Sequence, residues 1–205
     1  GMLHAINADT GKELWAYVPE LILPRIHLLA DMDYENKHQY MVDGTPEVGD
    51  VCPSAPGSIC SAAEWKTIIV GGLNRGGKGY YALDVTDPAS PQLLWEFTHA
   101  DMGYSYGNPR ITKRKDGTWV VLLTSGYNNP DGQGRLFVVN AYTGALLDTI
   151  NTGVGSAATP SGLAKISAHS VTSQTNNTSS AAYGGDMLGN LWRFDINGDL
   201  GAAGK

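Results

Sequence analysis

Short apolar and aromatic runs recur along the chain, and each of them ends on Asn or Asp. Four such runs align with one another: Gly1–Asn7, Lys78–Asp84, Gly134–Asn140 and Gly189–Asp195. Their last residues stand at positions 7, 84, 140 and 195, so the two later intervals are 56 and 55 residues and the first is 77. A period of this size is typical of a β-propeller blade, and the longer first interval indicates an inserted segment.

The same turn chemistry follows the first and the third run. Asn7 and Asn140 each begin a turn that ends on Thr-Gly, at Gly11 and Gly144. An Asn side chain can cap its own turn and Gly supplies a positive φ, so the pattern predicts hairpins with a bulge. The second run has a slightly longer link to the next apolar run, Leu93–Phe97.

Other β-branched and aromatic runs complete a four-strand pattern around these repeats. Three of them stand directly before a repeat: Glu64–Val70, Gly117–Thr124 and Ala181–Asp186. Three further runs stand ahead of those: Gln39–Asp43, Asn108–Thr112 and Ser161–Ile166.

The pattern therefore predicts an all-β chain of about twelve or thirteen strands, a partial β-propeller with four-stranded antiparallel blades. Two blades are complete and two are incomplete. The blade pieces cover about 1–19, 39–99, 108–153 and 161–197 of a single domain. An insert at 20–38 holds one short predicted helix, at 24–30, because Pro24 stands near its first turn.

Composition and charge fit this fold and exclude two classes of partner. Hydrophobic residues make up 42% and charged residues 17%, with 26 Gly and 10 Pro among 205 residues, as in a turn-rich globular protein. The formal net charge is -6 and the sequence has no Lys/Arg cluster, so we expect no binding to nucleic acid or to an anionic membrane. No apolar run reaches the roughly 18 residues that span a bilayer.

The two cysteines, Cys52 and Cys60, lie in a Pro/Gly/Ser-rich loop between two predicted strands. Structural disulfides are typical of exported proteins, so we expect a bridge that closes this loop and stabilises the fold by roughly 2–3 kcal/mol. The alternative is a pair of free thiols on the surface.

Residues that could carry chemistry form no catalytic or metal-binding motif. Asp31, Asp33 and Glu35 alternate as in a calcium loop but lack its Gly and its distal Glu, which favours a solvated acidic loop. The Gly-rich stretch 71–77 lacks the ending of a phosphate-binding loop and is interpreted as a hairpin loop. The histidines have no metal-ligand spacing, and no nucleophile elbow follows a strand. We expect no catalytic residue.

Several segments, taken in this order, resemble the PilY1 family of type IV pilus proteins over nearly the whole chain. They are Gly1–Ala5, Asp43–Pro46, Trp65–Gly72, Gly76–Pro88, Gly107–Pro109, Thr124–Asn128 and Tyr183–Asp195. The resemblance implies a modified propeller of the bacterial cell envelope that assists pilus assembly, extension and retraction, and attachment to host or abiotic surfaces. The partners that it implies are pilins or other pilus assembly proteins.

The chain departs from that family at the loop where many members bind calcium, just before the Tyr-Gly-Gly-Asp strand. The equivalent stretch, Ser170–Ser180, has no carboxylate, although Ca²⁺ requires several mostly anionic oxygen ligands. Asp186 alone cannot replace them. We therefore expect neither a metal site nor a cofactor.

The segment Ala5–Trp15 is also similar to the docking repeat of quinoprotein dehydrogenases. In those proteins the Trp and the Thr-Gly turn join neighbouring blades, so the likeness implies a docking role for Trp15, Trp95, Gly11 and Gly144 and describes architecture rather than chemistry. An oxidoreductase would need a central carboxylate, a cation and a cofactor clamp drawn from many blades. That reading and a purely structural scaffold remain as alternatives to a binding module.

Two further expectations concern surfaces. Tyr104, Tyr106 and Tyr127 stand on predicted loops and leave open a lectin-like site. The chain opens inside a repeat and shows no export signal, so we expect a piece of a longer exported protein. Its incomplete end blades would expose strand edges, which favours either a homodimer through these edges or internal capping.

Overall fold

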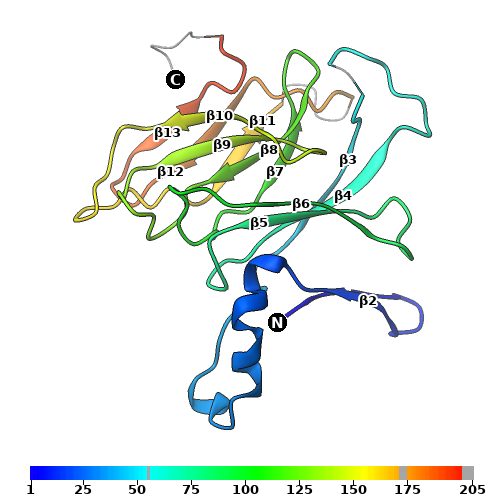
Figure 1. Cartoon of the computed structure of the whole chain (residues 1–205). Coiled ribbons are helices and arrows are strands. Elements are labelled where there is room, and N and C mark those ends of the chain that lie inside the picture. The colour runs from blue at the N-terminus through cyan, green and yellow to red at the C-terminus, as the bar shows by residue number, and fades with distance from the viewer. Residues whose placement is uncertain (55, 171–174, 200–205) are drawn as a thin grey trace.

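The computed structural model describes residues 1–54, 56–170 and 175–199, whose strands form four antiparallel sheets (Figure 1). The first is a hairpin of β1 (Leu3–Ile6) and β2 (Glu13–Tyr17). The second contains β3 (Glu47–Val51), β4 (Lys66–Gly72), β5 (Tyr80–Asp84) and β6 (Gln92–Phe97). The third contains β7 (Arg110–Lys113), β8 (Trp119–Thr124), β9 (Arg135–Asn140) and β10 (Leu146–Asn151). The fourth contains β11 (Ile166–His169), β12 (Ala181–Gly185) and β13 (Leu191–Phe194).

Within every sheet, each strand pairs with the strand that follows it in the chain, as in a propeller blade. In the described ranges helix is limited to two 3-10 segments, η1 (Glu20–Ala30) and η2 (Tyr34–Asn36). None of the helices in these ranges is long and apolar enough to cross a membrane. The prediction of an all-β partial propeller with two four-stranded sheets is confirmed.

The hairpin turns have the predicted chemistry. The Asn7 side-chain oxygen accepts from the backbone N–H of Asp9 (3.1 Å) and Thr10 (2.8 Å), and Asn140 accepts in the same way from Tyr142 (3.0 Å) and Thr143 (2.9 Å). The register then shifts at a bulge in the β1–β2, β5–β6 and β9–β10 hairpins. The repeats at 78–97 and 134–150 are therefore the third and fourth strands of successive four-stranded sheets, and β1–β2 is a hairpin of the same kind.

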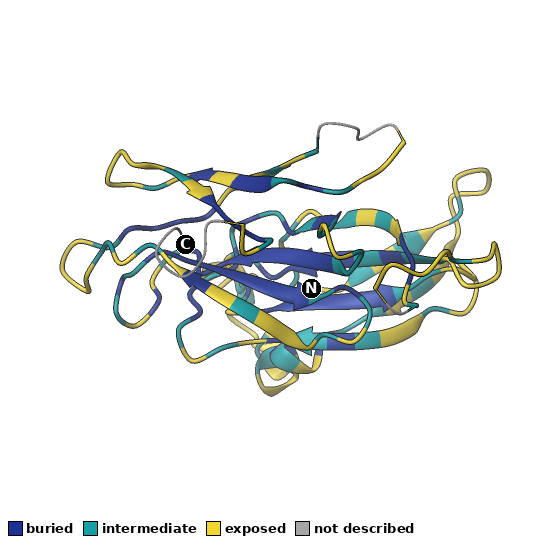
Figure 2. Cartoon of the chain, turned by 90° about the horizontal axis from the view of Figure 1, so that it is seen from above, coloured by how far each residue is buried: buried dark blue, intermediate teal, exposed yellow. Residues whose placement is uncertain are grey.

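The third sheet is buried on both faces, which explains the nearly continuous apolar runs of its central strands (Figure 2). Val121 and Leu123 of β8 pack toward the second sheet, in a cluster that includes Phe97. Val120 and Leu122 point to the other face and pack in a second cluster with Phe194 of β13. Successive residues of a strand face opposite sides of the sheet, so one strand here contributes to two hydrophobic cores.

The N-terminal hairpin and η1 are fastened to the second sheet through Glu96 of β6. The Glu96 carboxylate accepts from the Tyr17 hydroxyl (2.6 Å) and from the backbone N–H groups of Glu20 (2.6 Å) and Leu21 (3.0 Å). It thus satisfies two N–H groups at the start of η1, which would otherwise lack helical acceptors. Beneath this contact Ile22 is buried against Tyr81. In Figure 1, η1 and η2 extend beyond the sheets below this attachment.

The predicted strand Gln39–Asp43 is wrong, because β3 of this sheet is Glu47–Val51 instead. The segment before it is irregular, and its apolar residue Met41 is buried with Leu73 in the core beneath η1. The apolar residues of Gln39–Asp43 thus indicate burial in the core and not pairing in a β-sheet. Glu47–Val51 gave a weak signal because Gly49 and Asp50 interrupt it; a Cβ at Gly49 would stand 3.2 Å from Cδ1 of Ile111 on β7.

Two other elements differ from their predicted limits. Ser161–Ile166 forms a strand only from its last residue onward, where β11 begins. The preceding residues are held outside the ladder: the backbone N–H of Gly126 donates to Leu163 O (2.8 Å) and the Thr124 hydroxyl donates to Ala164 O (2.6 Å). The predicted helix at 24–30 is part of the longer η1, which starts at Glu20.

Candidate functional site, a cleft lined by tyrosines

A cleft of about 570 Å³ lies where three loops between strands meet the insert that contains η1 and η2. The β6–β7 loop contributes Tyr104 and Tyr106, and the β8–β9 loop contributes Tyr127 and Asn128. The remaining lining residues come from the insert, the segment after it and the β4–β5 loop: Arg25, His38, Gln39, Tyr40 and Arg75. We call this site the tyrosine cleft.

The two loops that carry three of the tyrosines are joined by their backbones. Tyr104 donates its N–H to Tyr127 O (2.7 Å), and Tyr127 donates its N–H to Tyr104 O (3.2 Å). The close approach needs Gly126, whose φ is 62° and where a Cβ would stand 1.9 Å from Tyr104 O. The rings of Tyr106 and Tyr127 then lie 5.3 Å apart, centre to centre. All three tyrosines are half-buried, which fixes their orientation and leaves part of each ring exposed.

The rim of the cleft is cationic. The Arg75 guanidinium stands 5.1 Å above the Tyr40 ring, and Arg25 donates from Nη2 to Gly76 O. Lys78, beside the cleft, donates from Nζ to Asn128 O (2.9 Å) and lies 5.7 Å from the Tyr104 ring centre. A cation near an aromatic face is stabilised by the ring quadrupole, which applies to Arg75 and Lys78. None of the ion pairs of the described residues involves these three cations.

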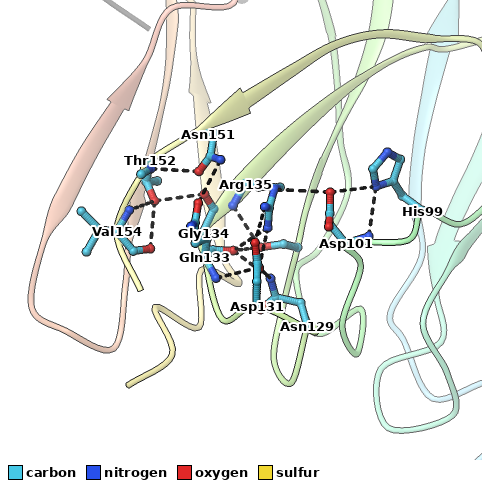
Figure 3. A network of polar contacts seen from close by, with 12 residues as sticks. His99, Asp101, Asn129, Asp131, Gln133, Gly134, Arg135, Asn151, Thr152 and Val154 are labelled. Atoms are coloured by element: carbon cyan, nitrogen blue, oxygen red, sulfur yellow. Dashed lines mark hydrogen bonds and ion pairs between the residues drawn. The ribbon is translucent and has the colours of Figure 1, made fainter. Parts of the chain in front are cut away.

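A network around Arg135 ties the two tyrosine loops to the third sheet (Figure 3). Arg135, at the start of β9, donates to both carboxylate oxygens of Asp131, with Nη1 to Oδ1 at 2.8 Å, and its Nε lies 3.6 Å from Asp101 Oδ2. His99 Nδ1 lies 3.6 Å from the same Asp101 oxygen. Asp101 belongs to the β6–β7 loop and Asp131 to the β8–β9 loop, so one side chain holds both loops.

The charges of this network are mutually stabilised. The hydrogen bond from Arg135 lowers the pKa of Asp131 to about 2, with burial opposing the shift and the Gln133 backbone N–H adding to it. The same hydrogen bond raises the pKa of Arg135. The Arg135 side chain is only 9% exposed, so it is a nearly buried cation that depends on its two carboxylates.

None of the predicted docking residues lines the cleft, and three of them, Trp15, Trp95 and Gly144, lie at contacts between successive sheets. Trp15 of β2 donates from Nε1 to Pro88 O (2.8 Å) in the turn of the second sheet. Trp95 of β6 repeats this contact one sheet further, with Nε1 donating to Ala141 O (3.1 Å) in the turn of the third sheet. Gly144 belongs to that turn, and a Cβ there would stand 2.6 Å from Trp95 Cβ. Nothing lies within 4 Å of the corresponding position at Gly11. A docking role for these residues stays a prediction.

The predicted disulfide between Cys52 and Cys60 is confirmed, with the two Cα atoms 6.0 Å apart. It closes the loop between β3 and β4, which lies near Trp119 at the start of β8. The Tyr127 loop follows the other end of β8, so the disulfide loop and the tyrosine cleft lie at opposite ends of the sheets. Ile59 at the tip of the disulfide loop is 97% exposed.

The stretch corresponding to the family calcium loop, Ser170–Ser180, is described only in part, since 171–174 lie outside the described residues. Asp186, which follows it, is used by its own turn: it accepts from the backbone N–H groups of Leu188 (3.0 Å) and Asn190 (2.9 Å) and from Trp192 Nε1 (2.9 Å). Burial works to raise the pKa of Asp186, but hydrogen bonds from the Asn190 side chain, the Trp192 indole, the Asn190 backbone and the Ser161 hydroxyl outweigh it and lower the pKa to about 2.

Other candidate ligands are dispersed. Lys37 Nζ lies 3.5 Å from Asp31 Oδ2 and 3.3 Å from Asp33 Oδ2, which neutralises part of the acidic loop. His38 lines the cleft, whereas His99 belongs to the Arg135 network. Among residues 1–54, 56–170 and 175–199, no group of three or more His, Cys, Asp or Glu side chains could hold a metal ion.

Sequence reasoning named the three loop tyrosines but missed the cations around them. Arg75 lies in the Gly-rich stretch that was correctly interpreted as a hairpin loop, and Arg25 lies in the helical insert 50 residues earlier. Only the fold brings them together. The one usable signal was the pair of basic residues at the tip of the β4–β5 hairpin, Arg75 and Lys78, which stand among glycines.

Comparison with known proteins gives consistent matches over almost the whole chain. The family described as the PilY1 beta-propeller domain matches residues 1–203. A type IV pilus biogenesis factor PilY1 homolog of Xylella fastidiosa (strain Temecula1) is 40% identical over 205 residues, which is 96% of this chain and 15% of that protein. The type IV pilus biogenesis factor PilY1 of Pseudomonas aeruginosa (strain PAO1) is 35% identical over 200 residues, covering 96% of this chain and 16% of that protein.

A solved structure has the same fold. The crystal structure of the Pseudomonas aeruginosa PilY1 C-terminal domain matches with a TM-score of 0.71 at 33% sequence identity, covering 96% of this chain and 37% of that one. The chain therefore spans less than a fifth of the length of these two curated relatives and just over a third of the solved domain.

Proposed function

Because the chain belongs to the PilY1 β-propeller domain family, we propose that it is a non-catalytic binding module of a type IV pilus biogenesis protein. The names of its relatives, type IV pilus biogenesis factors, support the role in pilus biogenesis. The tyrosine cleft carries the binding part of the proposal. Aromatic side chains fixed on loops at one end of a rigid sheet scaffold are typical of recognition sites.

The proposed location is the bacterial cell envelope, with the module exported and associated with the pilus. Its proposed partners are pilins or other pilus assembly proteins, together with a host or abiotic surface ligand in the tyrosine cleft. Such contacts would let one protein serve pilus assembly, the control of extension and retraction, and attachment. Nucleic acid and membrane are not proposed as partners, because the net charge of -6 disfavours both polyanions.

Two alternatives make different predictions. A quinoprotein-like oxidoreductase would show a quinone-dependent absorbance change when the chain is reconstituted with quinone and calcium, and substrate would bleach it. A purely structural scaffold would tolerate changes in the tyrosine cleft without loss of attachment. Both outcomes differ from those expected of a binding module.

A chimaera tests the proposal. The segment of Pseudomonas aeruginosa PilY1 that matches this chain is replaced by residues 1–205, and the chimaera is produced in a strain that lacks its own PilY1. Restored surface pili, counted by electron microscopy, are expected from the shared fold. The double variant Tyr106→Ala/Tyr127→Ala should keep the pili and lose attachment to surfaces.

The matched control is Tyr183→Ala, which removes an exposed tyrosine of β12, on the fourth sheet, outside the cleft lining. It should keep both pili and attachment. If the chimaera makes no pili, the role in biogenesis is refuted. If the double variant attaches like the parent, the cleft is not the binding site and the scaffold alternative is favoured.

A further inference from the structure

We propose that the tyrosine cleft binds an acidic saccharide, whose carboxylate pairs with the arginines of the rim and whose sugar ring stacks on the loop tyrosines. The inference rests on the proposed function as a binding module and adds the chemical class of the ligand.

The charge of the cleft is opposite to that of the chain. None of its nine lining residues is Asp or Glu, two are Arg, and Lys78 stands beside them, although the whole chain carries a net charge of -6. Among the ion pairs of the described residues, none involves Arg25 or Arg75. Guanidinium groups bind carboxylates through paired N–H donors. A ligand with an anionic group would therefore supply the partner that Arg25 and Arg75 do not have within the described residues.

The aromatic geometry fits a saccharide ring. The C–H bonds of a pyranose carry partial positive charge and pack on the negative face of an aromatic ring, while the ring hydroxyls remain free to form hydrogen bonds. The Tyr106 and Tyr127 rings pack on each other with their centres 5.3 Å apart and their planes tilted by 53°, and both residues are half-buried, so part of each ring stays exposed to a ligand. Gln39 and Asn128, both in the lining, supply amide groups of the kind that bind sugar hydroxyls.

The site is also prepared before a ligand arrives. The Arg135 network and the paired backbones of Tyr104 and Tyr127 hold the two tyrosine loops, and the contact of Arg25 with Gly76 O links the insert to the β4–β5 loop. A ligand therefore meets fixed side chains and loses little affinity to ordering them.

Size distinguishes a small acidic sugar from an anionic polymer. About 570 Å³ is in the range of small-molecule sites. A nucleic acid strand would instead need a basic groove that follows several phosphates, and only three cations are found here, on an acidic protein.

Isothermal titration with the purified 205-residue chain tests the inference. The probe is digalacturonate, and its neutral counterpart is α-1,4-galactobiose, which has hydroxymethyl groups in place of the carboxylates. Digalacturonate should bind at least about tenfold more tightly, and its affinity should fall as salt is raised. Equal affinity for the two sugars, or binding of neither, would overturn the inference.

Variants locate the binding site. Arg75→Gln should weaken digalacturonate binding by about tenfold while leaving galactobiose unchanged, because a hydrogen bond to a charged group is lost. Tyr106→Ala should weaken both sugars. The matched control Arg193→Gln removes an exposed arginine of β13, outside the cleft lining, and should change neither. Circular dichroism of each variant establishes that it is folded. A loss in the control equal to that in Arg75→Gln would place binding elsewhere and overturn the inference.

The same titration distinguishes an acidic saccharide from a nucleic acid as the ligand, and together with the chimaera it tests the ligand separately from the role in biogenesis. An oligothymidylate that binds more tightly than digalacturonate would overturn it in favour of a single-stranded nucleic acid. If the chimaera attaches through the cleft but the chain does not prefer digalacturonate, the inference fails and the proposed function stands. If digalacturonate binds as expected but the chimaera makes no pili, the inference stands and the role in biogenesis fails.

Discussion

Arg135 joins the two loops that carry Tyr104, Tyr106 and Tyr127. Its guanidinium lies between Asp101 of one tyrosine loop and Asp131 of the other. A nearly buried cation left without a partner is costly, so the two carboxylates and the arginine act as a unit. Changes to any of the three should move the loops rather than remove a ligand contact.

The pH dependence of stability tests this unit. In the folded chain the hydrogen bond from Arg135 lowers the pKa of Asp131 from 3.8 to about 2. A depressed carboxylate pKa contributes stability that is complete above the unfolded value and is lost as pH falls through the folded one. We therefore expect Asp131→Asn to be less stable than the parent at pH 7, with the difference shrinking between about pH 4 and pH 2.

Urea unfolding at a series of pH values measures this difference. The control is Glu35→Gln, which removes an exposed carboxylate of η2 that is outside the network. It should show no such convergence with the parent. A deficit in Asp131→Asn that stays constant from pH 7 to pH 2.5 would show that the carboxylate charge is not what stabilises the loops.

Of the individual residues that line the tyrosine cleft, the sequence predicted some and missed others. It placed Tyr104, Tyr106 and Tyr127 on loops, because each stands among Gly, Ser and Asn residues between strand patterns. It could not place Arg25 or Arg75 beside them. No short-range pattern links residues that are 50 positions apart, and only the packing of η1 on the second sheet brings them together.

Among the elements, the turns that join the third and fourth strands allow a matched comparison. Gly11 and Gly144 end equivalent turns with similar φ values of 67° and 74°. A Cβ at Gly11 meets nothing within 4 Å, whereas one at Gly144 would meet Trp95 at 2.6 Å. A substitution at either glycine would strain the backbone, but only one at Gly144 would also disturb the contact between neighbouring sheets. Comparing the two substitutions therefore measures the contribution of that contact.

We expect Gly11→Ala to destabilise the chain by about 1 kcal/mol, the cost of a left-handed conformation for an L-residue. Gly144→Ala should cost roughly 1–3 kcal/mol more, because the added methyl group displaces the Trp95 ring from the third sheet. Free energies from urea unfolding measure both. Equal costs would contradict a docking role for Trp95 and Gly144, since the tryptophan would then yield without penalty.

The disulfide makes a second prediction about elements. Cys52→Ser/Cys60→Ser should lower the free energy of unfolding by roughly 2–3 kcal/mol, the cost of freeing a short loop in the unfolded chain. Digalacturonate binding should be unchanged, because the bridged loop and the tyrosine cleft lie at opposite ends of the sheets. Urea unfolding of the parent with and without reductant provides the reference, and reduced parent should match the variant. Loss of sugar binding in the variant would show that the two ends are coupled.

The strands that the sequence predicted best are those of the repeats, because their closing Asn or Asp and their bulge recur in three hairpins. The first strand of the second sheet was missed. Glu47–Val51 contains Gly49, which lies close to Ile111 of the neighbouring sheet, and local propensity does not predict a contact of this kind. The apolar run before it, which contains Met41, is buried in a core without joining a sheet.

At the scale of the whole molecule, the two end sheets have fewer strands than the two central ones within the residues that the structure describes. The hairpin β1–β2 and the three-stranded β11–β12–β13 sheet contain fewer strands than the four-stranded blades between them. In the described part of the chain β13 pairs only with β12, and β13 carries Leu191, which is 79% exposed. A strand with an unpaired edge and an exposed apolar side chain is a template for another strand.

We therefore expect the 205-residue chain to form a dimer through β13, in which the free edges of two copies pair. The net charge of -6 opposes open-ended association, so a discrete dimer is favoured over fibres. Light scattering on a size-exclusion column should show a mass that rises with concentration from 21.8 kDa toward twice that value.

Leu191→Lys should shift the equilibrium to the monomer, because a charge on an edge strand disfavours pairing. The control Leu93→Lys makes the same change on β6, the edge strand of a complete four-stranded sheet, at a side chain 55% exposed; it should leave the mass unchanged if β13, and not any exposed edge, is the strand that pairs. A mass of 21.8 kDa at every concentration would contradict pairing through β13 and show that this edge is capped within the chain.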